Sequence, residues 1–346
     1  MNYNVLKEDV RLFAEQFELW EQLKSKTFLI TGATGLIGSV MIKCLQELNR
    51  QKHLNIRILA VVRNLEKAEI VLGQNCEDLK LVFLNDLKEI SIDSIGENVN
   101  YIIHLASPTN GKYMERYPVE TFALAYQSTF KLLEMAKQKG CDSLVYASSI
   151  EYYGQILDDR LITEKEIGYV NPLSSRSSYP MGKRMAEYLC YAYAQEFCVP
   201  AKVARLTQTF GAGVSKEENR VFAQFARSVM NGNDIVLHTT GKSSKAYCYT
   251  TDTISALLYI LLRGKIGDVY NVANEDTYIS ARDMAEYLKE RFNPAISVCV
   301  EIDESMGYAP VTRLKLSSEK LRSLGWKPRY GLYEMFYRLI NYLKDE

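Results

Sequence analysis

The chain has 346 residues, enough for a large α/β unit or two lobes with a substantial core. Lysine plus arginine and aspartate plus glutamate both number 42, so the formal net charge is zero. We therefore expect no nucleic-acid partner bound mainly through phosphate electrostatics, although a local basic pocket stays open.

Cysteine and histidine usage argues against metal or disulfide chemistry. The seven cysteines are scattered without a C-x-x-C pair, and the three histidines form no cluster. We expect reduced thiols and no metal site. The first residues lack the layout of a signal peptide, and the longest apolar run, 254–262, is too short to span a bilayer. A soluble, cytoplasmic protein with no membrane partner is expected.

Apolar periodicity predicts a leading helix over residues 5–24, packed on the main body. A buried strand at 27–30, a helix over 36–48 and a second strand at 56–62 then form a β-α-β unit. Later strands are expected at 81–84, 101–105, 143–147 and 201–206, with helices over 118–139 and 180–197. This alternation predicts an α/β fold, a doubly wound parallel sheet of the Rossmann type.

After Gly211 the alternation loosens, and a helix near 220–231 and a strand at 234–240 indicate a smaller, interleaved C-terminal α/β lobe. We assign to the dinucleotide-binding domain residues 1–211, with the leading helix inside 1–26, and residues 246–275. The substrate lobe takes residues 212–245 and 276–346. No Pro- or Gly-rich linker separates the two, so they should pack as one body.

A glycine-rich turn, T-G-A-T-G-L-I-G at 31–38, ends the first strand and opens the first helix. Its glycines permit a tight turn, close approach to a pyrophosphate and close helix–strand packing. The helix N-terminus offers free N–H groups to the phosphates. The β-α-β context favours dinucleotide binding over a purely structural turn. The expected contacts here are Gly32, Thr34, Gly35, Leu36, Ile37 and Gly38.

The end of the second strand should meet the adenosine ribose. An acid there binds the 2′-hydroxyl of NAD, whereas an arginine accommodates the 2′-phosphate of NADP. This chain has Arg63 and no carboxylate, so Arg63 either binds a phosphate or is a solvated charge. The expected cofactor is NAD, with NADP left open. Asp86 is a candidate partner of the adenine amine, or else an exposed turn residue.

Tyr179 and Lys183 stand four residues apart at the start of a predicted helix, where Pro180 suits the first turn. At this spacing the two side chains share one helix face. An ammonium beside a phenol favours the phenolate, so Tyr179 could exchange a proton nearer neutral pH. The alternative is an amphipathic surface pair, which the upstream glycine turn disfavours.

Ser149 and Glu151 follow the fifth predicted strand, at the edge where open α/β sheets place their ligands. The Ser149 hydroxyl is a candidate hydrogen-bond partner of the reacting oxygen beside Tyr179. Glu151 is a candidate general base or hydrogen-bond acceptor. The alternative for both is an ordinary serine-rich turn.

Together these motifs resemble the extended short-chain dehydrogenase/reductases that modify nucleotide sugars. The resemblance runs over nearly the whole chain, through 31–38, 104–107, 148–154, Tyr179-x-x-x-Lys183, Arg205 with 210–211, and L-G-W-K-P at 324–328. Residues 168–193 look most like UDP-glucuronate decarboxylases. The resemblance implies that bound NAD oxidises a sugar C4 hydroxyl to a 4-keto intermediate, which leads to decarboxylation of a UDP-uronic acid or to C4 epimerisation.

The resemblance also implies individual roles. Tyr179 takes the C4 proton, Lys183 lowers the pKa of Tyr179 and holds the nicotinamide ribose, Ser149 shares the hydrogen bond, and Glu151 assists near C5 and C6. Further cofactor contacts are Leu87, Leu105, Ala106 and Ser107. Substrate contacts are Ser107, Ser148, Arg176, Gln208, Arg220 and Lys245. A homodimer through helices 118–139 and 180–197 is also expected.

Several positions depart from the family pattern. Ala125 and Gln208 replace asparagines, Lys245 replaces a phosphate-binding arginine, and Arg63 replaces the NAD-selecting acid. Ile150 stands where thymidine-linked 4,6-dehydratases carry an acid. Two alternatives therefore stay open: a net NADPH-dependent reductase of a keto-sugar or other ketone, and a non-catalytic dinucleotide-binding regulator. The intact catalytic residues argue against the regulator.

Overall fold

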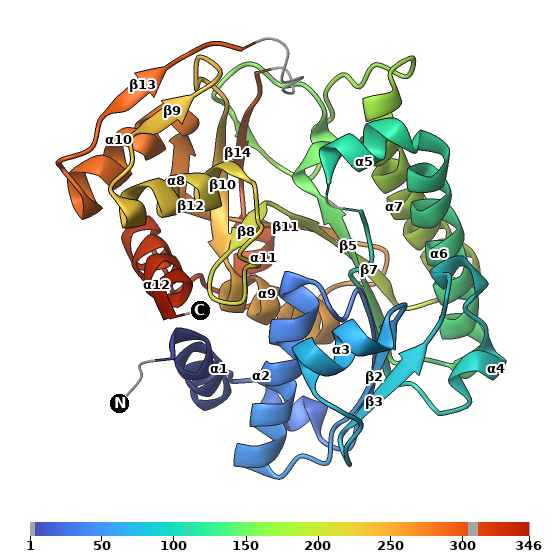
Figure 1. Ribbon diagram of the computed structural model, residues 1–346. Coiled ribbons are helices and arrows are strands. Elements are labelled where there is room, and N and C mark those ends of the chain that lie inside the picture. Colours follow the sequence, from blue (N-terminus) through green and yellow to red (C-terminus); the bar gives the residue numbers. More distant parts are fainter. Residues whose placement is uncertain (1–3, 109, 304–310, 346) are drawn as a thin grey trace.

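The computed structural model describes residues 4–108, 110–303 and 311–345. Its main layer is a seven-stranded sheet in the order β11-β7-β5-β4-β1-β2-β3, with every neighbouring pair parallel (Figure 1). The strands are β1 (Thr27–Thr31), β2 (Arg57–Val62), β3 (Leu79–Phe83), β4 (Tyr101–His104), β5 (Ser143–Ser149), β7 (Ala201–Leu206) and β11 (Val269–Val272). The predicted doubly wound parallel sheet is confirmed.

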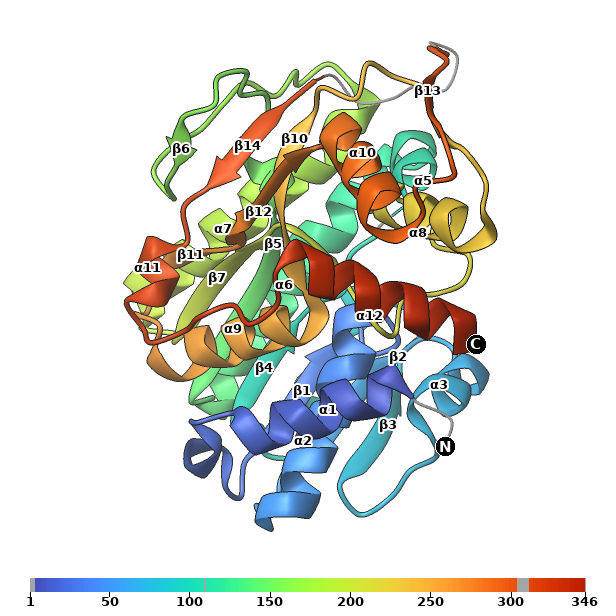
Figure 2. The same cartoon turned by 90° about the vertical axis from the view of Figure 1, so that its left-hand side faces the viewer.

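Helices cover both faces of this sheet (Figures 1 and 2). Successive residues of a strand point to opposite faces, so Phe28 and Ile30 enter one core while Leu29 enters the other. The first core lies under α1 (Val5–Gln16), α2 (Leu36–Lys52), α3 (Leu65–Leu72) and α9 (Thr250–Arg263). The second lies under α6 (Pro118–Lys139) and α7 (Ser178–Phe197).

A smaller, mixed sheet adjoins the carboxyl edge of the large one. It runs β12 (Asn274–Ser280), β10 (Ser244–Tyr249), β14 (Arg313–Leu316) and β6 (Leu161–Ile162), with β8 (Gln208–Phe210) also paired to β10. Around it lie α8 (Val221–Asn231), α10 (Ala281–Phe292), α12 (Leu332–Asp345) and the pair β9 (Ile235–Leu237) and β13 (Val298–Val300). The chain returns to the large layer between β10 and α9. The two-domain division stays a proposal.

Short elements complete the described part of the chain. They are η1 (Trp20–Leu23), η2 (Leu87–Glu89), α4 (Ile92–Ile95), α5 (Gly111–Arg116), η3 (Ile150–Tyr153), η4 (Ser175–Ser177) and α11 (Glu319–Arg322).

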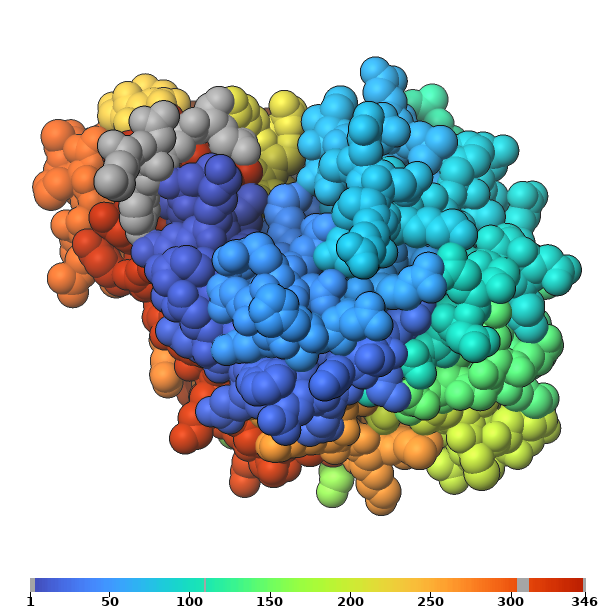
Figure 3. Space-filling view, turned by 90° about the horizontal axis from the view of Figure 1, so that it is seen from below, coloured from blue at the N-terminus to red at the C-terminus, as the bar shows by residue number. Residues whose placement is uncertain are grey.

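The leading helix is shorter than periodicity predicts. It ends at Gln16 because Phe17 adopts an extended backbone. The Phe17 ring stacks on Phe13 at 5.4 Å between centroids and meets Tyr259 edge-on at 6.0 Å. This core packing outweighs continuation of the helix. Figure 3 shows the N-terminal segment, in blue, beside the C-terminal region, in red, where Arg338 lies 2.8 Å from the Asp9 carboxylate.

Candidate active site

A cavity of about 1230 Å³ follows the carboxyl edge of the large sheet and continues to the smaller sheet. This is the edge at which open α/β sheets place ligands. Every residue predicted for the site lines it: Gly32, Thr34, Gly35, Leu36, Ile37, Gly38, Arg63, Asp86, Leu87, Leu105, Ala106, Ser107, Ser148, Ser149, Glu151, Arg176, Tyr179, Lys183, Gln208, Arg220 and Lys245. Lining the cavity places these residues but does not by itself assign their roles.

The glycine turn is so tightly packed that a side chain at Gly32 or Gly38 would clash with neighbouring backbone atoms. Gly32 has a φ of 68°, and a Cβ there would lie 2.8 Å from the Ala106 nitrogen. A Cβ at Gly38 would lie 2.3 Å from the Gly32 carbonyl oxygen. Gly35 is the N-cap residue of α2 and provides no side-chain cap, so first-turn N–H groups of α2 stay available to an anion. These residues fit the pyrophosphate of a dinucleotide.

The cavity wall that follows β2 carries two cations and is where the adenosine ribose is expected. Arg63 and Lys67 are exposed there, and no carboxylate lines the cavity between residues 61 and 67. Asp86 is already engaged: its carboxylate accepts from the Lys88 backbone at 2.9 Å and lies 3.2 Å from the Lys88 ammonium. Sequence reasoning missed Lys67, although Asn64 caps the first turn of α3 on the Lys67 N–H and thereby fixes its place.

Tyr179 and Lys183 lie on one face of α7, with the Lys183 ammonium 5.6 Å from the centroid of the Tyr179 ring. Lys183 is only 3% exposed and donates to the Ala147 carbonyl at 2.7 Å. Burial lowers the pKa of Lys183 to about 7, against the charges of Glu187 and Glu151.

The pKa of Tyr179 differs from the prediction. Burial and the Glu151 charge raise it to about 12, while hydrogen bonds with Ser149 and Ser107 oppose the rise. Lys183 does not lower the pKa of Tyr179 in the protein alone, because burial brings the lysine close to losing its own charge. The hydrogen bonds to the two serines nevertheless gather the predicted proton-handling groups around one phenol.

Two neighbouring serines at the end of β5 face different partners. The Ser149 hydroxyl lies near enough to the Tyr179 phenol to oppose the rise of its pKa, and it accepts from the Glu151 backbone at 3.2 Å. The Ser148 hydroxyl instead donates to the buried carboxylate of Glu187. Ser148 therefore lines the cavity without offering it a free hydroxyl, because successive strand residues point to opposite faces.

Three cations, Lys245, Arg220 and Arg176, lie close to one another in the cavity wall. Burial lowers the pKa of Lys245, and the charges of Arg220 and Arg176 lower it further. Arg220 is paired with Glu218 at 2.6 Å, and Arg176 lies 3.5 Å from Glu115. This cluster suits a diphosphate, which accepts several charge-assisted hydrogen bonds.

Two further structural residues support the site. His104 lies between Thr31 Oγ1 at 2.7 Å and Ser128 Oγ at 3.2 Å, and burial lowers its pKa to about 3, so its imidazole is neutral. Ala125 lies against Gly182: a Cβ added at Gly182 would be 3.1 Å from the Cβ of Ala125. The position of the expected asparagine is thus part of a close contact between α6 and α7.

Within residues 4–108, 110–303 and 311–345, no group of three His, Cys, Asp or Glu side chains could hold a metal ion. Over the same ranges, no helix is both long enough and apolar enough to cross a membrane.

Curated relatives are enzymes of sugar nucleotides. UDP-glucuronic acid decarboxylase 3 of Arabidopsis thaliana is 28% identical over 318 residues, which cover 88% of this chain and 85% of that protein. Human dTDP-D-glucose 4,6-dehydratase is 24% identical over 344 residues, which cover 93% and 91%.

Solved structures share the fold. UDP-glucuronic acid 4-epimerase from Bacillus cereus, in complex with UDP-glucuronic acid and NAD, has a TM-score of 0.76 at 18% identity, covering 92% of this chain and 99% of that one. A dTDP-glucose 4,6-dehydratase from Bacillus anthracis, with a TM-score of 0.74 at 18% identity and coverage of 92% and 96%, also holds NAD. The family model described as "NAD dependent epimerase/dehydratase family" matches residues 28–273. The chain belongs to this family.

Proposed function

We propose that this enzyme oxidises the C4 hydroxyl of a nucleotide sugar and then either decarboxylates a UDP-uronic acid or epimerises C4. The observation that carries the proposal is a single cavity with a buried proton-handling group around Tyr179 and a cation cluster at its substrate end. The curated decarboxylases and the solved uronate epimerase support the substrate class.

The chain's own residues would divide the work as follows. Bound NAD supplies the oxidising equivalent. Tyr179 would accept the proton of the C4 hydroxyl, and Ser149 would hydrogen-bond the oxygen of that hydroxyl. The phenolate form of Tyr179, which burial disfavours, would be favoured by the positive charge of oxidised NAD held in the same cavity. Lys183 would hold the nicotinamide ribose of the cofactor, and Glu151 would assist near C5 and C6 of the sugar.

The substrate's diphosphate would lie among Arg176, Arg220 and Lys245, with Gln208 beside them. Ile150 weighs against 4,6-dehydration, because it is buried among apolar neighbours and offers no acid near the reacting carbons.

A panel of UDP- and dTDP-linked sugars, with UDP-glucuronate included, tests the proposal by product mass. Loss of carbon dioxide indicates decarboxylation, and an unchanged mass with a new chromatographic peak indicates epimerisation. Neither should consume added cofactor. A product that gains two hydrogens, or loses water, would contradict the proposal.

Arg63 and Lys67 favour a second candidate, a net NADPH-dependent reduction of a keto-sugar or other ketone. Two cations with no acid at the ribose end suit a 2′-phosphate. The test is the Kd of NADP against that of NAD, with Arg63→Ala as the matched variant. The reductase is supported if the Kd for NADP is lower than that for NAD and if Arg63→Ala raises the Kd for NADP alone. A lower Kd for NAD would rule it out.

We also propose a homodimer through α6 and α7, which pack side by side (Figure 1). Tyr188 and Tyr191 of α7 are 63% and 52% exposed, and Val119 and Tyr126 of α6 are exposed as well. Sedimentation should give a dimer that Tyr188→Glu converts to a monomer. A wild-type monomer at micromolar concentration would overturn this. The cytoplasmic location stays a prediction.

A further inference from the structure

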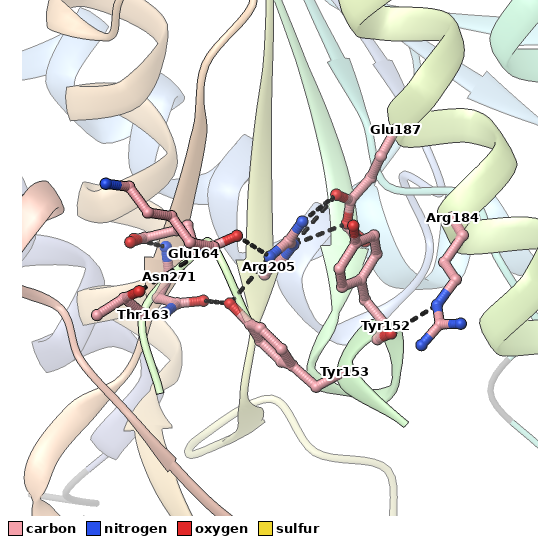
Figure 4. A network of polar contacts seen from close by, with 10 residues as sticks. Tyr152, Tyr153, Thr163, Glu164, Arg184, Glu187, Arg205 and Asn271 are labelled. Atoms are coloured by element: carbon pink, nitrogen blue, oxygen red, sulfur yellow. Dashed lines mark hydrogen bonds and ion pairs between the residues drawn. The ribbon is translucent and has the colours of Figure 1, made fainter. Parts of the chain in front are cut away.

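A buried ion pair lies behind the catalytic edge, between Glu187 of α7 and Arg205 of β7 (Figure 4). The Arg205 Nη2 atom is 2.8 Å from Glu187 Oε2, and the residues are 3% and 5% exposed. Neither side chain lines the cavity. The pair is outside the site predicted from sequence, so its role needs an explanation.

Arg205 is held on all sides. Its Nε donates to Glu187, and its Nη1 donates to the Tyr153 hydroxyl at 3.0 Å and to the Glu164 carbonyl at 2.9 Å. The guanidinium lies 3.4 Å from the centroid of the Tyr152 ring. Tyr153 in turn donates to Asn271 at 2.6 Å (Figure 4). Arg205 thus fixes the two residues that follow Glu151.

Glu187 holds the other side of the same segment. Its carboxylate accepts the hydroxyl proton of Ser148, the residue before Ser149. It also lies one helical turn beyond Lys183, on the same buried face of α7. The ion pair therefore contacts this segment at both ends: Glu187 binds Ser148, and Arg205 contacts Tyr152 and Tyr153.

We propose that Glu187 and Arg205 are positioning residues that hold the 148–153 segment so that Ser149 and Glu151 face Tyr179. The Ser149 hydroxyl and the Glu151 carboxylate keep their positions only if the neighbouring side chains are themselves fixed by packing and hydrogen bonds. A buried ion pair is weak evidence of stabilisation, since well-packed apolar residues often replace one without loss. Positioning is the function that accounts for its contacts on both sides of the catalytic residues. The proposal rests on the proposed function only where turnover is measured.

The pair also bears on the charge of Lys183. The groups facing Lys183 are Glu187 on its own helix, Glu151 from η3, His104 from β4, Tyr146 from β5 and Tyr179. Of these, the two carboxylates favour the ammonium against burial. Removing the Glu187 charge should therefore shift the titration of Lys183 to lower pH.

The central experiment compares wild type, Glu187→Gln, the double variant Glu187→Leu/Arg205→Met, and the control Glu196→Gln, which alters an exposed carboxylate of the same helix. Each is tested for melting temperature, Kd of NAD, turnover of the sugar that wild type converts, and the pH midpoint of Lys183 acetylation by a pulse of acetic anhydride. The last two readouts separate positioning from stability. Acetylation requires no substrate.

In Glu187→Gln the melting temperature should fall, because Arg205 loses its counter-charge. In the double variant the melting temperature should return toward wild type while turnover stays down by about 100-fold, as expected for misplaced catalytic groups. The Kd of NAD should not change. Lys183 acetylation should begin at lower pH in the double variant and be unaltered in Glu196→Gln.

Recovery of turnover together with stability in the double variant would show that the pair is structural only. An unmoved Lys183 midpoint would remove the electrostatic part of the proposal. If wild type converts no sugar, the proposed function fails, and the position of residues 148–153 in a crystal structure of the double variant still decides the positioning claim. An unshifted segment there would overturn it.

Discussion

Two lysines are buried at opposite ends of the seven-stranded sheet, in very different surroundings. Lys183 donates to Ala147 near the carboxyl end of β5, with two carboxylates close by. Lys202 donates to Ser143 Oγ at the start of β5, at 2.6 Å, and burial is the sole cause of its pKa shift. Burial lowers the pKa of Lys183 to about 7 and that of Lys202 to about 8.

The comparison separates chemistry from stability. Desolvation acts on both amines, but Lys183 at the carboxyl end also has the Tyr179 phenol and two carboxylates close by, whereas burial is the one cause of the Lys202 shift. The carboxyl end should therefore control turnover, whereas the amino end should affect only the free energy of unfolding. Variants at each end test that division.

The largest effect is expected from Tyr179→Phe at the carboxyl end. The change removes only the hydroxyl proposed to exchange a proton with the C4 hydroxyl of the sugar, so turnover should fall by about 1000-fold. The Kd of NAD should be unchanged, because the proposed pyrophosphate cradle at the glycine turn is left intact. Turnover at the wild-type rate would remove Tyr179 from the mechanism.

Lys183→Met should lower turnover by about 100-fold or more, because the amine beside the phenol is lost. The melting temperature should not fall, since a buried, desolvated amine is replaced by an apolar chain of similar length. Differential scanning fluorimetry and the turnover assay check the two halves together. A variant that is active and unstable would reverse the assignment of this lysine.

Lys245→Ala should raise KM about 10- to 100-fold, because the proposed hydrogen bond from the ammonium to the substrate diphosphate is lost, with little change in kcat. Lys245→Arg keeps the charge and adds a planar fork, so its KM should stay close to wild type. Initial-rate kinetics with the converted sugar measure both. A fall in kcat at constant KM would move Lys245 from binding to catalysis.

Lys202→Met, at the amino end, should leave turnover unchanged. The folded-state pKa of about 8 lies below the ordinary value of 10.5, so between these pH values the unfolded chain binds a proton that the native chain does not. Wild-type stability should therefore rise with pH across that window. In the variant the free energy of unfolding should no longer rise with pH across this window, and at pH 7 it should exceed that of wild type by on the order of 3 kcal/mol.

Urea unfolding at pH 7, 8.5 and 10 measures this effect. Lys43→Met, which removes a half-buried amine that donates to the Val71 carbonyl of α3, is a control that should leave the Lys202 pH window intact. Equal stability of wild type and Lys202→Met at pH 7 would mean that the Lys202 amine is already uncharged or hydrated.

Sequence reasoning predicted the parallel sheet, because strand–helix alternation and the glycine turn are local signals. It also predicted residues that line one cavity, since motifs at the carboxyl ends of parallel strands meet at one edge of the sheet. It missed the end of α1, where Phe17 packs against Tyr259 from a distant part of the chain. Such contacts across more than two hundred residues have no local pattern.

The same limit applies within the site. The direction of the Tyr179 pKa depends on burial, which spacing on a helix does not reveal. Glu187 stood four residues after Lys183 and could have been suspected, but its bond to Ser148 joins α7 to β5 and required the tertiary structure.

The most direct test of the account is conversion of a nucleotide sugar deuterated at C4, without added cofactor, followed by mass spectrometry of the product. If the site at the carboxyl edge of the sheet oxidises C4 and then reduces it again, turnover should be slower than with the unlabelled sugar. The product should keep the deuterium at C4. Turnover that requires stoichiometric NADPH, or that is equally fast with both sugars and unaffected by Tyr179→Phe, would contradict it.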